Sequence, residues 1–564
     1  MPGGRFGPQV KWSPVGRHRR VSATTHEGAL VQHGAASGTR PGSTVVQEAA
    51  RRRSFAVISH PDAGKSTLTE ALALHAHAIT EAGHINGKSG RRHTVSDWME
   101  MEQTRGISIT SASLQFAYRD TVINLLDTPG HADFSEDTYR VLSAVDAAVM
   151  LVDAAKGLEA QTMKLFAVCK HRGIPLLTVV NKWDRPGLDA LALMDEIAER
   201  TGLTPTPLTW PVGVAGDFRG VIDRRTGTYL RFAPTSGGAH IAPEERLDPA
   251  AAAAQEGAAW TRSVEESELL AASGADHDAE SFLAGVSTPV LFASAVRNFG
   301  VHALLDVLVD LAPAPGPRVS VDGVPRAIDD PFSAFVFKMQ AGMDTAHRDR
   351  LAFIRVCSGL FERGMVVTST RTGRPFATKY AQQAFGRERS VIDTAYPGDV
   401  VGLVNGSDLR VGDTLYLDKA VQYPPLPTFA PEHFAVVRAR DAGRYKQFRR
   451  GISQLEAEGV VQVLRSELRG DQAPVLAAVG PMQFEVAEHR MATEFNSPVL
   501  LERLGYTLAL RTTPEWVRAL DAERGVEVLR RADGDLLALF PDRWRVASAR
   551  RNHPDAVLEP PVAA

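Results

Sequence analysis

Residues 54–70, SFAVISHPDAGKSTLTE, combine residue types that could bind the phosphates of a nucleotide. The apolar run 55–58 is typical of a buried strand, and a turn with Gly64 leads from it to Lys65 and Ser66, where apolar residues begin to recur at helical spacing. In such a unit the loop N–H groups and the helix N-terminus face an anion, the lysine reaches the outer phosphates and the hydroxyl binds Mg²⁺. We expect the nucleotide to contact Ser59, His60, Pro61, Asp62, Ala63, Gly64, Lys65, Ser66 and Thr67.

This loop departs from the usual eight-residue phosphate-binding pattern at one position. Ser59 stands where the pattern has its first glycine. An ordinary strand–turn–helix with a surface lysine would give a similar string, so the loop alone does not decide between the two interpretations. The motifs that follow along the chain decide between these interpretations.

The string DTPGH directly follows the apolar residues of a second predicted strand. A carboxylate at a strand end can hold Mg²⁺ through water, and a glycine peptide can approach a γ-phosphate closely. By itself the string could also be an ordinary turn. We expect nucleotide contacts from Asp127, Thr128, Pro129, Gly130 and His131.

Two further strings could read a guanine base. In NKWD, which follows LLTVV, the carboxylate can accept hydrogen bonds from the N1–H and the 2-amino group of guanine, an arrangement that adenine cannot offer. Each such bond to a charged acceptor contributes roughly 1.5–3 kcal/mol. After VLFA, backbone groups could meet the guanine O6. The residues concerned are Asn181, Lys182, Trp183, Asp184, Ser294 and Ala295.

Short apolar strands alternate with helical segments between residues 54 and 310, which predicts a mostly parallel sheet with helices on both faces. Strands are expected at 122–126, 147–152, 175–180 and 290–294, and all but 147–152 end where a motif begins. Ligands of such sheets bind at the carboxyl ends of the strands. Motifs in this order, each at a strand end, predict a GTP-binding domain of the P-loop class.

The composition is that of an ordinary globular protein of several domains. The chain has 564 residues, of which 44% are hydrophobic and 23% charged, and a formal net charge of −3. This charge gives no general attraction to nucleic acid, so any RNA contact needs a local basic patch. We find no run of membrane-span length and no secretory segment. Cys169 and Cys357 lie in apolar runs, as expected for buried thiols in a reducing compartment.

The sequence predicts a multidomain α/β protein. Residues 1–50, rich in Gly, Pro, Ser, Thr and Ala, are expected to form a disordered tail. The P-loop domain is expected at 51–311, with an Ala- and Glu-rich surface insertion near 233–285. Alternating strands with punctuating glycines predict an antiparallel β-barrel at 318–428, and an α+β domain should follow at 430–564.

Between the first two motifs, the string SDWMEMEQTRGISIT resembles the first switch of the translational GTPases. Ser108 stands there in place of the usual threonine. The strings SHPDAGKST, NLLDTPGHADFSEDTYR and SAVRNFGV are similar to those of the class II release factors, the bacterial peptide chain release factor 3 group. Serine at positions 59 and 108 is typical of that group. The resemblance runs from about residue 51 nearly to the end of the chain.

The resemblance implies roles for matching residues. Gly64 and Lys65 would hold the phosphates of GTP or GDP, and the Gly130 N–H would meet the γ-phosphate. His131 would position the attacking water, so His131, Lys65 and Gly130 form the expected catalytic set. The implied Mg²⁺ ligands are Ser66 and Ser108 directly, with Asp127 behind them.

The function that the resemblance implies is a ribosome-dependent GTPase that helps class I, codon-recognising release factors to leave after peptide release. Expected partners are the ribosome, through its RNA and proteins, and the class I release factors, with no membrane and no DNA. A cytoplasmic monomer is expected. The cluster Arg444, Lys446, Arg449 and Arg450 could contact ribosomal RNA, although a solvated helix face would look the same.

Other functions fit less well. A translocating elongation factor would continue for well over a hundred further residues, for which this chain has no room. Carriers of aminoacyl-tRNA end in two barrels, whereas the carboxyl-terminal part of this chain is expected to be α+β. A non-hydrolysing GTP-dependent scaffold of an RNA assembly is disfavoured by the intact Lys65, Asp127 and His131.

Overall fold

The computed structural model describes residues 41–79, 111–233, 240–341, 350–385, 388–404, 406, 408–426, 429–466 and 469–561. Most of the predicted tail and the switch string with Ser108 lie outside these residues. In the described part of the chain, no helix combines the length and apolar character that a membrane crossing requires.

Residues predicted to end the disordered tail instead form helix α1 (Pro41–Ala50). Val45 and Ala49, one helical turn apart, are buried. The Glu48 carboxylate accepts hydrogen bonds from the side chains of Arg51 and Arg52, just beyond the end of the helix. The prediction of disorder was wrong for this segment because its Gly- and Ser-rich composition concealed the short apolar face.

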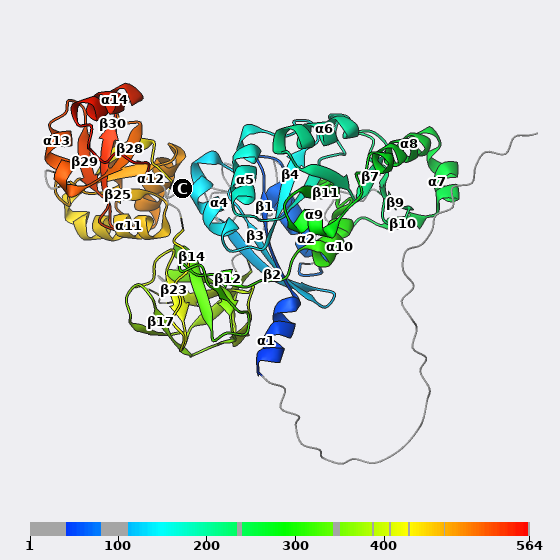
Figure 1. The fold of residues 1–564 in the computed structure, drawn as a ribbon, viewed down its shortest axis with the longest axis horizontal. Coiled ribbons are helices and arrows are strands. Elements are labelled where there is room, and N and C mark those ends of the chain that lie inside the picture. Colours follow the sequence, from blue (N-terminus) through cyan, green and yellow to red (C-terminus); the bar gives the residue numbers. More distant parts are fainter. Residues whose placement is uncertain are drawn as a thin grey trace, which may run out of the picture. The chain divides into compact units, whose positions relative to one another are not determined.

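A seven-stranded sheet forms the centre of the first domain (Figure 1), in the order β2-β3-β1-β4-β5-β11-β6. All neighbouring strands are parallel except β2 and β3. The strands are β1 (Arg52–Ile58), β2 (Ala112–Tyr118), β3 (Thr121–Asp127), β4 (Ala147–Asp153), β5 (Leu176–Asn181), β6 (Thr204–Pro207) and β11 (Ser287–Phe292).

Helices cover both faces of this sheet, which confirms the predicted α/β class. Phe55 and Val57 of β1 face the core shared with α2 and α10, whereas Ala56 and Ile58 face the core of α4, α5 and α6. The helices are α2 (Lys65–His75), α4 (Ser135–Leu142), α5 (Ala160–His171), α6 (Ala190–Thr201) and α10 (Val301–Leu311).

A four-stranded antiparallel sheet and three helices lie between β6 and β11 in the chain. Trp260 and Leu270 of α8 are buried in the same core as α6, so part of the predicted surface insertion contributes to the domain core. The elements are β7 (Thr209–Val212), β8 (Gly220–Asp223), β9 (Thr228–Phe232), β10 (Glu244–Leu247), α7 (Pro249–Glu256), α8 (Ala258–Ala272) and α9 (Ala279–Leu283).

The second domain is antiparallel, as predicted. Eight of its strands form one sheet in the order β18-β17-β23-β14-β15-β22-β19-β20 around an apolar core. Its strands are β12 (Arg318–Val319), β13 (Pro325–Arg326), β14 (Ser333–Ala341), β15 (Arg350–Ser358), β16 (Phe361–Glu362), β17 (Val366–Ser369), β18 (Pro375–Ala377), β19 (Ala381–Phe385), β20 (Glu388–Val391), β21 (Thr394–Ala395), β22 (Val400–Val404) and β23 (Thr414–Tyr416).

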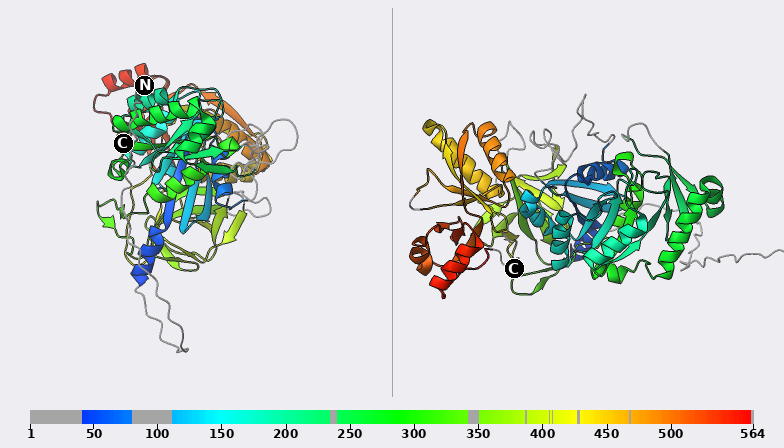
Figure 2. Two further views of the ribbon diagram at one scale, coloured as in Figure 1. Left: turned by 90° about the vertical axis from the view of Figure 1, so that its right-hand side faces the viewer. Right: turned by 90° about the horizontal axis from the view of Figure 1, so that it is seen from above.

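The C-terminal domain is α+β (Figure 2), also as predicted, with the sheets β25-β26-β24-β27 and β28-β30-β29. Its elements are β24 (His433–Ala439), α11 (Tyr445–Glu458), β25 (Gln462–Leu464), β26 (Val475–Ala478), α12 (Met482–Thr493), β27 (Val499–Leu504), β28 (Leu508–Thr512), α13 (Val517–Asp521), β29 (Glu527–Arg530), β30 (Leu536–Phe540) and α14 (Arg543–Asn552).

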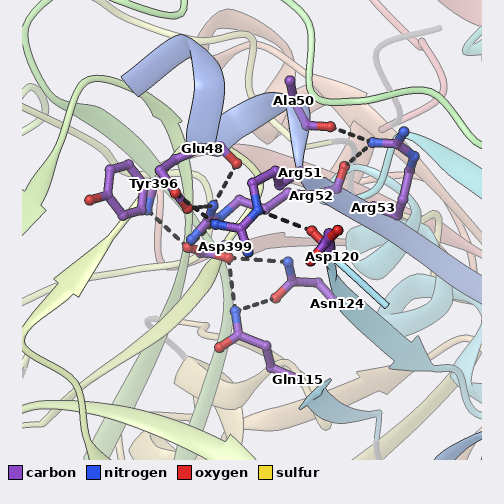
Figure 3. Close-up of polar contacts among 10 residues, drawn as sticks. All are labelled: Glu48, Ala50, Arg51, Arg52, Arg53, Gln115, Asp120, Asn124, Tyr396 and Asp399. Atoms are coloured by element: carbon purple, nitrogen blue, oxygen red, sulfur yellow. Dashed lines mark hydrogen bonds and ion pairs between the residues drawn. The ribbon is translucent and has the colours of Figure 1, made fainter. Parts of the chain in front are cut away.

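Asp399, just before β22, joins the second domain to the first through buried polar contacts (Figure 3). Its Oδ2 accepts a hydrogen bond from Arg52 Nε at 2.8 Å, and its Oδ1 accepts from Gln115 at 2.8 Å and Asn124 at 3.2 Å. Arg52 also lies over the Tyr396 ring. The hydrogen bond from Arg52, opposed by partial burial, lowers the pKa of Glu48. The charges at this joint are therefore paired.

Candidate nucleotide-binding site

The loop after β1 has the conformation expected of a phosphate cradle. Gly64 is the N-cap of α2 and has a φ of 99°, in the left-handed region that favours glycine. A Cβ atom there would lie 2.6 Å from Asn181 Nδ2, so there is no room for a side chain. Helix α2 begins at the next residue, Lys65, and its N-terminus therefore opens at this loop.

The Ser59 side chain explains why serine can replace the usual glycine. Lys65 Nζ donates a hydrogen bond to Ser59 Oγ at 3.0 Å and is 3.3 Å from the His60 carbonyl oxygen. The serine hydroxyl thus helps to hold the buried lysine head at the mouth of the loop. The His60 imidazole contacts Glu159, whose carboxylate lies 3.0 Å from His60 Nε2. Burial lowers the pKa of His60.

The structure brings the DTPGH string beside this loop. Asp127 is buried at the end of β3, and Thr128 Oγ1 donates to the Val57 carbonyl of β1 at 2.6 Å. A Cβ atom on Gly130 would lie 2.8 Å from Lys65 Nζ. The peptide at Gly130 and the lysine head are therefore close neighbours, as a common phosphate group would require. Ser66 occupies the first turn of α2, and Thr67 follows it.

Asn181 connects three predicted motifs. Its Nδ2 donates to the Ala63 carbonyl at 2.9 Å, and its Oδ1 accepts from the Ala295 N–H at 2.9 Å. Lys182 Nζ donates to the Asp62 carbonyl. The phosphate loop and the two expected base-reading strings thus form one cluster, although they come from distant parts of the sequence.

Asp184 is held at the edge of this cluster. Its Oδ1 accepts a 2.6 Å hydrogen bond from Ser294 Oγ, and its Oδ2 lies 3.4 Å from Arg297 Nε. Trp183 beside it is buried, and its backbone N–H donates to the Ala293 carbonyl. Ser294 was predicted for its backbone, but its hydroxyl also orients the carboxylate.

The sequence reading missed Asp153, at the end of β4, the one predicted strand to which no motif was assigned. Its Oδ2 accepts a 2.8 Å bond from Lys182 Nζ. Burial acts to raise the pKa of Asp153, but the hydrogen bonds from Lys182 and the Ala155 N–H outweigh it and lower the pKa. Its position at a strand end was the signal that could have found it.

His131 lies on the loop before the 3₁₀ turn η1 (Ala132–Phe134) and is about one-third exposed. Its Nδ1 is 3.3 Å from the Asp133 backbone nitrogen and 3.2 Å from Asp133 Oδ1. Its ring also contacts Phe134 edge-on. The imidazole that follows Gly130 is therefore partly exposed and contacts Asp133 and Phe134.

Comparison with protein families gives one match for each domain. Residues 50–314 match the elongation factor Tu GTP-binding domain, and 331–418 match elongation factor G domain 2. Residues 423–550 match the C-terminal domain of class II release factor RF3.

Individual proteins are similar over nearly the whole chain. Peptide chain release factor 3 of Gloeobacter violaceus is 46% identical over 526 residues, which cover 91% of this chain and 97% of that protein. The protein of the same name from Microcystis aeruginosa is 47% identical over 90% of this chain and 94% of its own. A solved protein from Thermus thermophilus shares the fold, with a TM-score of 0.65 and 21% identity over 86% of this chain and 72% of its own.

Proposed function

This chain belongs to the peptide chain release factor 3 family and is a GTPase of translation termination, and on this premise we propose that it promotes the departure of class I release factors from the ribosome after peptide release. Interaction with the ribosome follows from membership of the family. One observation carries the proposal. The same chain combines a domain that matches a GTP-binding domain with a C-terminal region that matches that of class II release factors.

Guanine recognition is assigned to Asp184. Its carboxylate is fixed by the Ser294 hydroxyl, so both acceptor oxygens are oriented before the base arrives. Asn181 connects the surrounding loops, because its amide donates to the Ala63 carbonyl and accepts from the Ala295 N–H. A preorganised acceptor loses little freedom on binding, which favours affinity.

The phosphates are assigned to the cradle formed by Gly64, Lys65 and the N-terminus of α2. The oxygen donors of Ser66 and Asp127 are of the type that Mg²⁺ prefers, and with Ser108 they would hold the ion, which when bound would neutralise charge on the β- and γ-phosphates. Lys65 adds a fixed positive charge beside Gly130, where the γ-phosphate would lie.

Hydrolysis is assigned to His131 as the residue that orients the attacking water. Phosphoryl transfer asks the protein mainly for positioning and charge. About one-third of the His131 side chain is exposed, so an external group can reach it. Contact with ribosomal RNA would complete its placement, which would account for the proposed dependence of turnover on the ribosome.

The proposed setting is the cytoplasm, where ribosomes complete peptide release, and the protein is proposed to act there as a monomer. The test uses purified ribosomes that hold a fluorescent class I release factor after peptide release. With GTP the protein should accelerate dissociation of that factor, and ribosomes should raise GTP turnover by a factor on the order of 10³–10⁵. Unchanged dissociation would contradict the proposal, and accelerated dissociation without turnover would favour the non-hydrolysing scaffold.

A further inference from the structure

Asp133 uses its two carboxylate oxygens on two different partners. Oδ1 lies 3.2 Å from His131 Nδ1, and Oδ2 accepts a 2.7 Å hydrogen bond from the Met482 N–H. Met482 is the first residue of α12, in the C-terminal domain. The Asp133 side chain is only 10% exposed, so water competes little for either contact. One buried carboxylate therefore connects His131 to the C-terminal domain.

The start of α12 is suited to an external carboxylate. The first N–H groups of a helix have no partner within it, and its positive end favours a negative charge. Pro481 is the N-cap and supplies no side-chain hydrogen bond. Gln483 Oε1 accepts from the N–H groups of Val479 and Gly480, and the Met482 N–H is directed to Asp133. A residue of the GTP-binding domain thus caps a helix of the C-terminal domain.

Gly480 leaves the space that this carboxylate occupies. A Cβ atom at position 480 would overlap Cγ, Oδ1 and Oδ2 of Asp133. The φ angle of Gly480 is not positive, so its backbone conformation is open to an alanine. The glycine is therefore needed for the approach of Asp133 and not for the turn itself.

Apolar packing beside the carboxylate stabilises the same contact. Phe134 and Val486 are buried together, with Val460 and Met482 packed around them. Further along the chain, in α4, the Arg140 side chain lies directly against Gly459. The C-terminal domain thus contacts the elements that follow Gly130, the residue beside the proposed γ-phosphate position.

Asp133 offers His131 Nδ1 two partners that select opposite proton positions. The Asp133 N–H requires a lone pair on Nδ1 and so leaves the ring proton on Nε2. The carboxylate favours a proton on Nδ1, which leaves a lone pair on Nε2. Only in the second form can Nε2 accept a hydrogen bond from water. The position of the carboxylate therefore decides how His131 can act.

We propose that Asp133 is a positioning residue that couples the docking of α12 to the orientation of His131, an inference that rests on the proposed role of His131 in hydrolysis. When α12 is docked, the Met482 N–H holds Oδ2, and this keeps Oδ1 at Nδ1. When α12 moves away, Oδ2 loses its anchor and Oδ1 is no longer held at His131 Nδ1. The Asp133 N–H then remains the partner of Nδ1 and leaves the ring proton on Nε2. The C-terminal domain thus controls hydrolysis through a single side chain.

The test is a double-mutant cycle on the full chain with Gly480→Ala and Asp133→Ala. Gly480→Ala should lower single-turnover GTP cleavage at saturating ribosomes by at least tenfold, because the new methyl group displaces the carboxylate. The GTP affinity and the ribosome concentration at half-maximal rate should stay within about threefold of the parent. In the Asp133→Ala background, Gly480→Ala should have almost no further effect on the cleavage rate, since the carboxylate that its methyl group would displace is absent. Gly505→Ala, in the same domain and with open space at its Cβ, is the matched control.

The inference would be overturned if Gly480→Ala cleaved GTP within twofold of the parent, or if Gly505→Ala lost as much activity as Gly480→Ala. Independent effects of Gly480→Ala and Asp133→Ala would overturn it as well. Hydrogen exchange without ribosomes tests the contact separately. Asp133→Ala should accelerate exchange of the Met482 amide, and unchanged exchange would also overturn the inference. If the parent itself shows no ribosome-stimulated cleavage, the proposed function fails, whereas the exchange result still decides whether Asp133 holds α12.

Discussion

Asn181 and Asp184 have different roles at the proposed base-binding end of the site. Both amide ends of Asn181 are bonded to loop backbone, so this residue braces the site. Asp184 is bonded through Ser294 and Arg297, both of which come from the segment just after β11. The carboxylate is thereby presented as an acceptor, which is the property that guanine recognition requires.

Asp184→Asn should change the preferred base. The amide loses one acceptor and presents an N–H toward the 2-amino group of guanine, whereas xanthine carries a carbonyl there. Losing a hydrogen bond to a charged acceptor costs about 1.5–3 kcal/mol, so GTP affinity should fall at least about tenfold and XTP should be preferred. Competition binding of GTP against XTP measures this, and an unchanged preference for GTP would show that another residue reads the base.

The motif residues could be predicted from the sequence because each motif is local and follows a strand. Ser59, Lys65, Gly130 and Asn181 were all assigned in this way. Asp153 and Asp133 were not, since their significance depends on partners that the fold supplies from other parts of the chain: Lys182 for the first and Met482 for the second. Asp153 had only its position at a strand end to mark it, and nothing in the sequence indicates the partner of Asp133.

Helix α1 illustrates the limits of prediction at the level of elements. The alternation of strands and helices was clear in the sequence because apolar runs recur throughout 54–310. In α1, by contrast, only Val45 and Ala49 mark the buried face, and Gly, Ser and Thr around them are poor helix formers. Packing against the rest of the chain outweighs this weak propensity.

Val45→Asp should therefore destabilise the protein, whereas Val46→Asp should not. Val45 is 6% exposed and its neighbour Val46 is 47% exposed, so the same substitution is compared at a buried and an exposed position of one helix. If α1 detaches, the new aspartate stays in water and is not buried without a partner. The protein then loses only the packing of Val45 and its neighbours, so its free energy of unfolding should fall by about 2–3 kcal/mol. Thermal unfolding of the two variants measures the difference, and equal melting temperatures would contradict the packing of α1.

Across the whole described chain, the GTP-binding domain is joined to both following domains through charged side chains. Arg52 pairs with Asp399 at one joint, and Arg355 pairs with Asp146 nearby. Asp133 reaches Met482 at the other. Changes in pattern along the sequence suggest where one domain gives way to the next, but they give no sign of these joints, because each joint depends on two residues that lie hundreds of positions apart.

Asp399→Ala should be far more harmful than Asp393→Ala in the same domain. Removing Asp399 takes away one of the two carboxylates that pair with the buried Arg52 guanidinium, and Glu48 remains as the other. Gln115 and Asn124 also lose this acceptor, so we expect a cost of about 2–4 kcal/mol. Asp393 pairs with Arg363 at the surface, is 72% exposed and should contribute less than about 1 kcal/mol. Urea unfolding followed by tryptophan fluorescence compares the two, and similar midpoints would show that the Asp399 joint does not stabilise the protein.

The most direct test of the account is single-turnover GTP cleavage by His131→Ala at saturating ribosomes, measured beside its nucleotide affinity. His131 is assigned a role in orienting water and no contact with the bound phosphates, so the variant should bind GTP and ribosomes about as well as the parent. Its cleavage rate should fall by at least roughly 100-fold, as expected for a group that acts mainly in the transition state. His171→Ala, at the exposed end of α5, should cleave like the parent. Cleavage by His131→Ala within tenfold of the parent would show that His131 is structural and would contradict the mechanism.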